Sequence, residues 1–199
     1  MRRSKGLKIV ISVLVAAAFI FAAAYALIKG YEKAHHDMML AAHPLMYSEY
    51  VEKYAEEYDI DKYIIYAFIK TESGFDPNAE SSVGARGLMQ LMETAFEWVK
   101  FRLGDDDDIT FDDMFDPETN IRYGTYMVSY LTRYFGCTDT AAAAYFSGIG
   151  EVGKWVGDPE ISADGVHLDK IPSRNAAHYV DKINNALNAY YELYVNERK

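Results

Sequence analysis

The N-terminal segment is the feature that most constrains this chain. From Ile9 to Ile28 there are 20 consecutive residues without a charge. A helix of this length is long enough to cross the ~30 Å hydrocarbon core of a bilayer. Four basic residues precede the run, and basic residues favour the cytoplasmic side of a membrane helix; they are Arg2, Arg3, Lys5 and Lys8. We therefore expect residues 1–29 to form a single-pass membrane anchor with a cytoplasmic N-terminus.

A cleavable signal peptide is the alternative for the same segment. The apolar region of a signal peptide usually has about 7–15 residues, and this one is longer. Small residues at Ala24 and Ala26 would nevertheless suit a cleavage site. The length favours an uncleaved anchor, and under either interpretation the residues beyond Lys29 act outside the cytoplasm.

Residues 30–44 are expected to be a linker, or else a continuation of the anchor helix, and residues 45–199 are expected to form one domain. His35, His36 and His43 raise the question of a metal site in the linker. Neighbouring histidines point to different faces of a helix, and no acidic partner completes a known ligand spacing, so we predict no metal site.

Charge and cysteine content exclude several kinds of function. The net charge is −10, and residues 1–30 carry +5, so the rest of the chain carries about −15. A domain this acidic lacks the basic surface that nucleic-acid binding requires. Cys137 is the only cysteine, which excludes an intramolecular disulfide and a cysteine metal cluster. Seventeen tyrosines and ten phenylalanines indicate aromatic packing, or a cleft that stacks on a flat ligand such as a sugar.

Apolar residues beyond the linker recur at helical spacing, and no segment alternates as a strand would. An aspartate at 59 or 61 is expected to cap the second helix and Gly74 to end it, and Asp116 followed by Pro117 to start another. The acidic segment 105–116 lacks the pattern of an EF-hand and is expected to be a loop. We therefore predict an all-α domain, with helices at about 45–58, 61–73, 87–103, 117–135, 140–146, 150–156 and 173–195.

One glutamate stands at the end of the apolar helix expected at 61–73. Glu72 is followed by a turn rich in special residues, among them Gly84 and Gly87. Burial and the negative end of a helix dipole both disfavour the charged form of a carboxyl group, so they would raise its pKa. A carboxyl of that kind can donate a proton near neutral pH. An ordinary exposed glutamate at a helix end is the simpler interpretation of the position alone.

The segment around Glu72 resembles the signature of the soluble lytic transglycosylases, the SLT domain family, which are lysozyme-like enzymes that cleave the glycan of bacterial peptidoglycan. The resemblance covers about residues 45–190. It rests on ESGFDPNAES (72–81), GARGLMQLM (84–92), Thr94-Ala95, Asn120-Ile121, Gly124, Tyr126, AYFSG (144–148), Gly150, Val152, Lys154-Trp155, Pro172 and Tyr179-Val180.

Four residues at three places depart from the family pattern, and Tyr126 is shifted by one from the usual tyrosine position. Glu93 stands where proline is usual, Phe146 where asparagine is usual, and Asn175-Ala176 where Glu-Thr is usual. These changes affect expected contacts to the substrate, and they leave Glu72 in place.

The resemblance implies a mechanism that uses one carboxyl group. Glu72 would first donate a proton to the bond between N-acetylmuramic acid and N-acetylglucosamine, while the acetamido group of the substrate stabilises the charge at C1. Glu72 would then act as a base on the C6 hydroxyl, which closes a 1,6-anhydro ring without consuming water. No cofactor or metal is needed.

The same resemblance, together with side-chain chemistry, suggests the residues that bind substrate. Ser81 would bond Glu72 or the acetamido group, Gln90 would bond sugar amides or hydroxyls, and the hydroxyl of Tyr145 would point at Glu72. The full expected set is Ser81, Gly87, Met89, Gln90, Tyr145 and Tyr179.

The expected partners are peptidoglycan glycan strands, the cytoplasmic membrane through the N-terminal helix, and cell-wall or secretion machinery. Two other functions stay open at this point. A muramidase would use water and need a second carboxylate, for which Asp76, Glu80 and Glu93 are the sequence neighbours. An inactive peptidoglycan-binding module is the other, and Phe146 and Asn175 motivate it.

Overall fold

The computed structural model describes residues 2–105 and 108–196, with side chains from residue 11 onward. The chain divides into two compact units, Met1–Pro44 and Leu45–Lys199, and each is described by itself.

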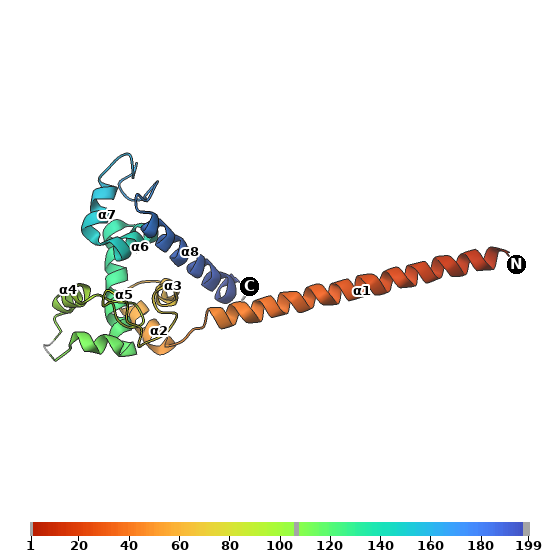
Figure 1. The fold of residues 1–199 in the computed structure, drawn as a ribbon, viewed down its shortest axis with the longest axis horizontal. Helices are drawn as coiled ribbons and strands as arrows, with labels where there is room; N and C mark the ends of the chain where they lie inside the picture. Colours follow the sequence, from red (N-terminus) through yellow and green to blue (C-terminus); the bar gives the residue numbers. More distant parts are fainter. Residues whose placement is uncertain (1, 106–107, 197–199) are drawn as a thin grey trace. The chain divides into compact units, whose positions relative to one another are not determined.

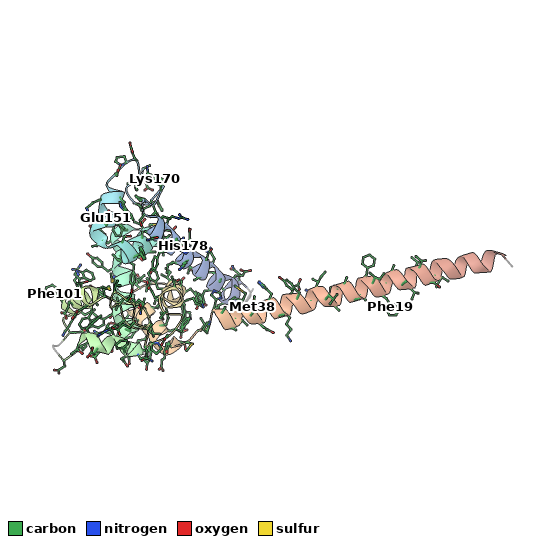
Figure 2. The ribbon with its side chains drawn as sticks, viewed as in Figure 1. Phe19, Met38, Phe101, Glu151, Lys170 and His178 are labelled. Atoms are coloured by element: carbon green, nitrogen blue, oxygen red, sulfur yellow. The ribbon has the colours of Figure 1, made fainter. Side chains whose placement is uncertain are left out.

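The first unit is one long helix, α1 (Arg2–Ala42), coloured red to orange in Figure 1. Its stretch Ile11–Ala42 is long and apolar enough to cross a membrane, with a mean hydropathy of 2.5 in its most apolar window. Side chains such as Phe19 are exposed along this window (Figure 2). Residues 30–42 are helical, so this part of the expected linker continues the helix instead of interrupting it.

The regular structure of the second unit, among its described residues, is helical, as the sequence predicted. Within 45–105 and 108–196 the structure contains no β-strand, only two isolated bridges that join Glu80 to Arg86 and Arg86 to Leu91. Its helices are α2 (Ser48–Glu57), α3 (Lys62–Glu72), α4 (Glu93–Leu103), the 3-10 helix η1 (Phe111–Phe115), α5 (Pro117–Phe135), α6 (Thr138–Ser147), α7 (Ile149–Val156) and α8 (Arg174–Tyr194).

Local sequence signals start and end these helices. The Asp61 carboxylate accepts a hydrogen bond from the Tyr63 N–H at 2.8 Å and caps α3. Asp116 caps α5 in the same way, with Pro117 as the first helical residue. Helix α3 ends at Glu72, and Gly74 then takes a left-handed φ of 60°. The predicted stop therefore places Glu72 in the last turn.

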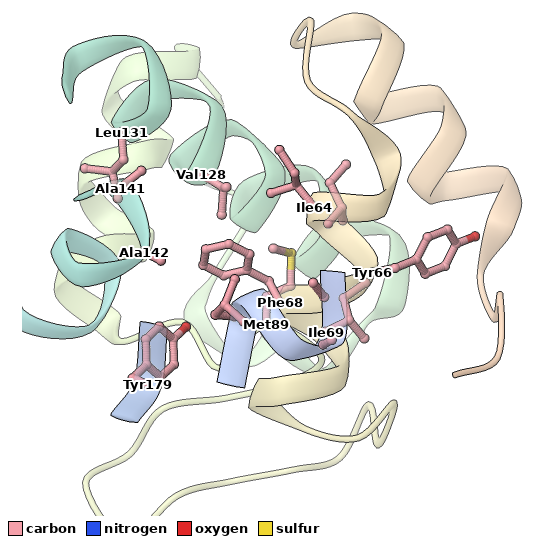
Figure 3. Close-up of a cluster of buried hydrophobic side chains, with 14 of the residues drawn as sticks. Ile64, Tyr66, Phe68, Ile69, Met89, Val128, Leu131, Ala141, Ala142 and Tyr179 are labelled. Atoms are coloured by element: carbon pink, nitrogen blue, oxygen red, sulfur yellow. The ribbon is translucent and has the colours of Figure 1, made fainter. Parts of the chain in front are cut away.

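Helix α3 lies in the centre of the core and packs along α8. Phe68 of α3 is fully buried, and Figure 3 shows it with Met89, Val128 of α5 and Ala142 of α6 around it. The alanines 141–144 of α6 are buried as well, and their small side chains let α5 and α8 pack closely on both sides of this helix. The core thus fixes the position of the last turn of α3.

The helix predicted at 87–103 begins later than expected, at Glu93. Gly87 and Gln90 have left-handed φ values of 74° and 48°, which interrupt helical hydrogen bonding. Instead, the Arg86 and Leu91 backbones exchange two hydrogen bonds of 3.0 and 3.1 Å. Residues 79–91 therefore form a folded loop.

Part of the acidic segment 105–116 is also more ordered than a loop. Thr110 and Asp113 form a capping box that starts η1. Residues 106 and 107 of this segment lie outside the described residues.

Candidate active site

The partly buried carboxylate of Glu72 is the centre of the site. Because α3 packs along α8, Tyr179 of α8 reaches it, and the Tyr179 hydroxyl donates a hydrogen bond of 2.5 Å to Glu72 Oε1. The Tyr179 side chain is only 7% exposed, so this bond is largely shielded from water. The structure therefore brings together the two residues that the sequence placed 107 positions apart.

Burial raises the pKa of Glu72 to about 7, while the hydrogen bond from Tyr179 and the positive charge of Lys182 act in the opposite direction. No second carboxylate among the described residues contributes to this shift. A carboxyl group with a pKa near neutrality is populated in both protonation states. It can therefore donate a proton in one step and accept one in the next.

Tyr145 lies near the site but does not bond Glu72 as expected. Its hydroxyl donates a hydrogen bond of 2.6 Å to the backbone carbonyl of Met89. Burial, followed by the nearby charge of Glu72, raises the pKa of Tyr145 well above its ordinary value, so the hydroxyl stays protonated. Tyr145 thus fastens the 79–91 loop to α6, beside the acid.

Met89 and Gly87 were expected at the substrate, and in the free protein both have a packing role. The Met89 side chain is fully buried and lies against Gly124, where any Cβ would come within 2.3 Å of its sulfur. A Cβ on Gly87 would lie 2.0 Å from the Met114 carbonyl oxygen and 2.3 Å from Asn120 Nδ2. Gly87 must be a glycine because its backbone approaches α5 and η1 closely.

Ser81 and Gln90 make their hydrogen bonds within the same loop. Ser81 Oγ accepts from the Ala85 N–H at 2.9 Å. Gln90 Nε2 donates to the carbonyls of Ala79 and Gly87, both at 3.0 Å. In the free protein these side chains hold the shape of the loop, and the expected bond from Ser81 to Glu72 is not formed.

Asn120 and Ser73 support the site and were not predicted as site residues. The buried amide of Asn120 accepts from the Met89 N–H at 2.8 Å and donates to the Arg86 and Met114 carbonyls at 3.0 and 2.8 Å. Ser73, next to Glu72, donates to the Leu88 carbonyl at 2.8 Å. Asn120 was recognised only as part of a motif, and nothing local in the sequence identifies the backbone groups that it bonds.

Phe146 lies beside the acid and departs from the family pattern. Its ring stacks on Tyr179, with centroids 4.9 Å apart and an interplanar angle of 28°. The Phe146 side chain is nevertheless 49% exposed. It therefore presents an apolar ring to solvent next to the Glu72–Tyr179 pair.

A mainly apolar cavity of about 260 Å³ lies between α4, α5 and the start of α7. Its lining residues, most of them apolar or aromatic, are Thr94, Ala95, Trp98, Met127, Tyr130, Leu131, Gly148 and Ile149. Among the residues that the structure describes, no three histidine, cysteine, aspartate or glutamate side chains gather in a group that could hold a metal ion.

The described residues form an all-helical domain in which a partly buried glutamate with a raised pKa lies at the end of the central helix. Residues 49–165, more than half of the chain, match the transglycosylase SLT domain family, and the chain belongs to this family. The resemblance inferred from the sequence, and the lysozyme-like helical fold that it implied, are confirmed.

Known proteins similar to this chain carry consistent names. A soluble lytic murein transglycosylase of Salmonella typhimurium is 33% identical over 159 residues, which cover 78% of this chain and 24% of that protein. A membrane-bound lytic murein transglycosylase C of Serratia proteamaculans is 30% identical over 165 residues, which cover 72% of this chain and 46% of that protein.

A solved structure shares the fold. The 70 kDa soluble lytic transglycosylase of Escherichia coli superposes with a TM-score of 0.69 at 25% identity, over 77% of this chain and 25% of that one. The chain thus spans between about a quarter and a half of the length of these relatives.

Proposed function

We propose that this chain is a membrane-anchored lytic transglycosylase that cleaves the bond between N-acetylmuramic acid and N-acetylglucosamine in peptidoglycan. The observation that carries the proposal is the partly buried Glu72, whose pKa lies near 7 and whose carboxylate accepts a hydrogen bond from Tyr179. Membership of the SLT family and the names of the relatives support the same reaction.

Glu72 acts twice in the proposed reaction. In its protonated form it donates the proton to the glycosidic oxygen, and the bond from that oxygen to C1 of the muramic acid breaks. The acetamido oxygen of the same sugar stabilises the positive charge at C1. The Glu72 carboxylate then removes the proton of the C6 hydroxyl, whose oxygen bonds to C1 and closes the 1,6-anhydro ring. The carboxyl group ends protonated, as it began.

Tyr179 positions the carboxyl group through these two steps. Its hydroxyl bonds Oε1, which leaves Oε2 to exchange the proton with substrate. The bond also stabilises the carboxylate form, and so it limits how far burial raises the pKa of Glu72. The balance keeps both protonation states accessible near neutral pH.

The contacts of two neighbouring acids favour transglycosylation over hydrolysis. Two of the neighbouring acids are engaged elsewhere. Asp76 accepts from the Asn78 N–H at 2.9 Å, and Glu80 pairs with Arg86 at 3.2 Å. A water-activating base would have to come from another residue.

Helix α1 supports anchoring in the membrane, and the membrane-bound relative is consistent with it. We propose a single span with the basic N-terminus in the cytoplasm and the catalytic domain on the cell-wall side. Glycan strands are the substrate, and cell-wall or secretion machinery remains the expected protein partner.

Replacement of Glu72 by glutamine tests whether the chain is an enzyme. The full chain in detergent is incubated with purified peptidoglycan, and soluble muropeptides are quantified over time. We expect the wild type to release them and Glu72→Gln to lose at least a thousandfold in rate while it still binds the glycan. Equal behaviour of the two proteins, with binding but no release, would instead establish a binding module.

A further inference from the structure

The exposed ring of Phe146 has no explanation in the catalytic steps above. Phe146 is the next-to-last residue of α6, at a position where the family pattern usually has asparagine. Phe146 is 49% exposed, so much of its large apolar side chain is in contact with water beside the proposed catalytic site at Glu72. The exposed part of the ring offers an apolar face to a ligand beside the Glu72–Tyr179 pair.

Phe146 is also held in a defined orientation. One side of its ring stacks on Tyr179, with centroids 4.9 Å apart. Tyr179 is fixed in turn by its hydrogen bond to Glu72 and by an edge contact to the buried Phe68 at 6.4 Å. Glu72, Tyr179 and Phe146 therefore contact one another in sequence, and these contacts hold the exposed Phe146 ring in place in the free protein.

The chemistry of a phenyl ring limits what it can recognise. Asparagine offers hydrogen-bond donors and an acceptor to sugar hydroxyls or amides, whereas phenylalanine offers only an apolar face. A pyranose ring carries several axial C–H groups on one face, and such a face packs on an aromatic ring. The substitution therefore exchanges a hydrogen-bonding contact for a stacking contact.

We infer that Phe146 is a specificity-determining residue that stacks on the apolar face of an N-acetylhexosamine ring next to the bond that Glu72 cleaves. The inference rests on the proposed function and deepens it. Phe146 contributes binding of the sugar in the ground state and transition state alike, so its loss raises KM and leaves kcat nearly unchanged.

A purely structural role for Phe146 makes a different prediction. If the ring only shielded the Tyr179–Glu72 bond from water, any apolar side chain of similar size would replace it. Loss of the shield would then lower the pKa of Glu72 and shift the pH profile, with little effect on KM. Leucine keeps the apolar bulk but has no ring face, and tryptophan keeps the ring face, so the two variants separate the roles.

The test measures steady-state cleavage of soluble glycan strands and binding of N-acetylchitotetraose by the full chain in detergent. We expect Phe146→Leu to raise KM and the Kd of the tetramer about five- to tenfold, with kcat within about twofold and the pH profile unchanged. Phe146→Trp should keep KM and the Kd of the tetramer at their wild-type values, because tryptophan keeps the ring face. Phe101→Leu is the matched control, because Phe101 is an exposed phenylalanine on another helix, α4 (Figure 2).

The outcomes separate this inference from the proposed function. Wild-type KM and Kd in Phe146→Leu, in a protein that cleaves glycan, would overturn the stacking role alone. A shifted pH profile without a change in KM in Phe146→Ala, which removes the apolar bulk that leucine keeps, would assign the shielding role instead. A wild type that neither binds the tetramer nor cleaves glycan would overturn the proposed function, and the inference with it.

Discussion

Removal of one oxygen atom from Tyr179 tests the electrostatic balance at Glu72. In Tyr179→Phe the 2.5 Å hydrogen bond to Oε1 is lost, while the ring that packs between Phe68 and Phe146 is kept. A hydrogen bond to a charged group contributes about 1.5–3 kcal/mol. Since about 1.4 kcal/mol corresponds to one pKa unit, we expect the pKa of Glu72 to rise by roughly 1–2 units.

The direction of the effect on the rate follows from the role of the acid. Cleavage requires protonated Glu72, so kcat/KM falls as the pH rises through its pKa, which is about 7 in the wild type. In Tyr179→Phe this basic limb should move to higher pH by about 1–2 units. The assay is the pH dependence of kcat/KM on soluble glycan strands.

Tyr145→Phe is the control for this prediction. Its hydroxyl bonds the Met89 carbonyl and not Glu72, so its loss should weaken the fold and leave the basic limb in place. A limb that does not move in Tyr179→Phe, or that moves to lower pH, would refute the view that this hydrogen bond stabilises the Glu72 carboxylate.

Two further predictions concern stability. Folding raises the pKa of Glu72 from 4.5 to about 7, so the folded state binds the proton more tightly than the unfolded state, and stability is lost as the pH rises through that range. Glutamine does not titrate. Urea unfolding should therefore show that Glu72→Gln is more stable than the wild type by about 2–3 kcal/mol at pH 8 and by almost nothing at pH 4. Equal differences at both pH values would contradict the burial of this carboxyl group. Gly87→Ala should lower the free energy of unfolding by more than about 3 kcal/mol, since its Cβ would meet the Met114 carbonyl oxygen at 2.0 Å. Gly84 has a similar φ but open space around it, so Gly84→Ala should lower the free energy of unfolding by only about 1–2 kcal/mol. Similar losses in the two glycine variants would show that backbone strain, and not the close approach, decides the cost.

The position of Glu72 could be predicted because it depends on signals that lie close together in the sequence. An aspartate cap at Asp61, an apolar run and a glycine stop at Gly74 define α3 and place the glutamate in its last turn. The same pattern allowed an elevated pKa, but only the resemblance to the SLT family favoured it over an ordinary exposed glutamate.

The roles of the loop residues could not be predicted, because they depend on partners distant in sequence. The sequence shows that Gly87 is a glycine, but the atoms that exclude a Cβ belong to Met114 and Asn120. In the same way, the sequence does not show that Met89 packs against Gly124. The start of α4 was predicted too early because a left-handed residue such as Gln90 has no sequence signature of its own.

The central claim is that Glu72 removes the proton of the C6 hydroxyl of the muramic acid, so that the C6 oxygen, and not water, bonds to C1. Mass spectrometry of the muropeptides that the full chain releases from purified peptidoglycan, beside the Glu72→Gln variant, tests it most directly. The account predicts products that end in 1,6-anhydro-muramic acid and that are absent from the variant. Products with reducing ends, heavier by one water, would contradict it and would require a second carboxylate at the site.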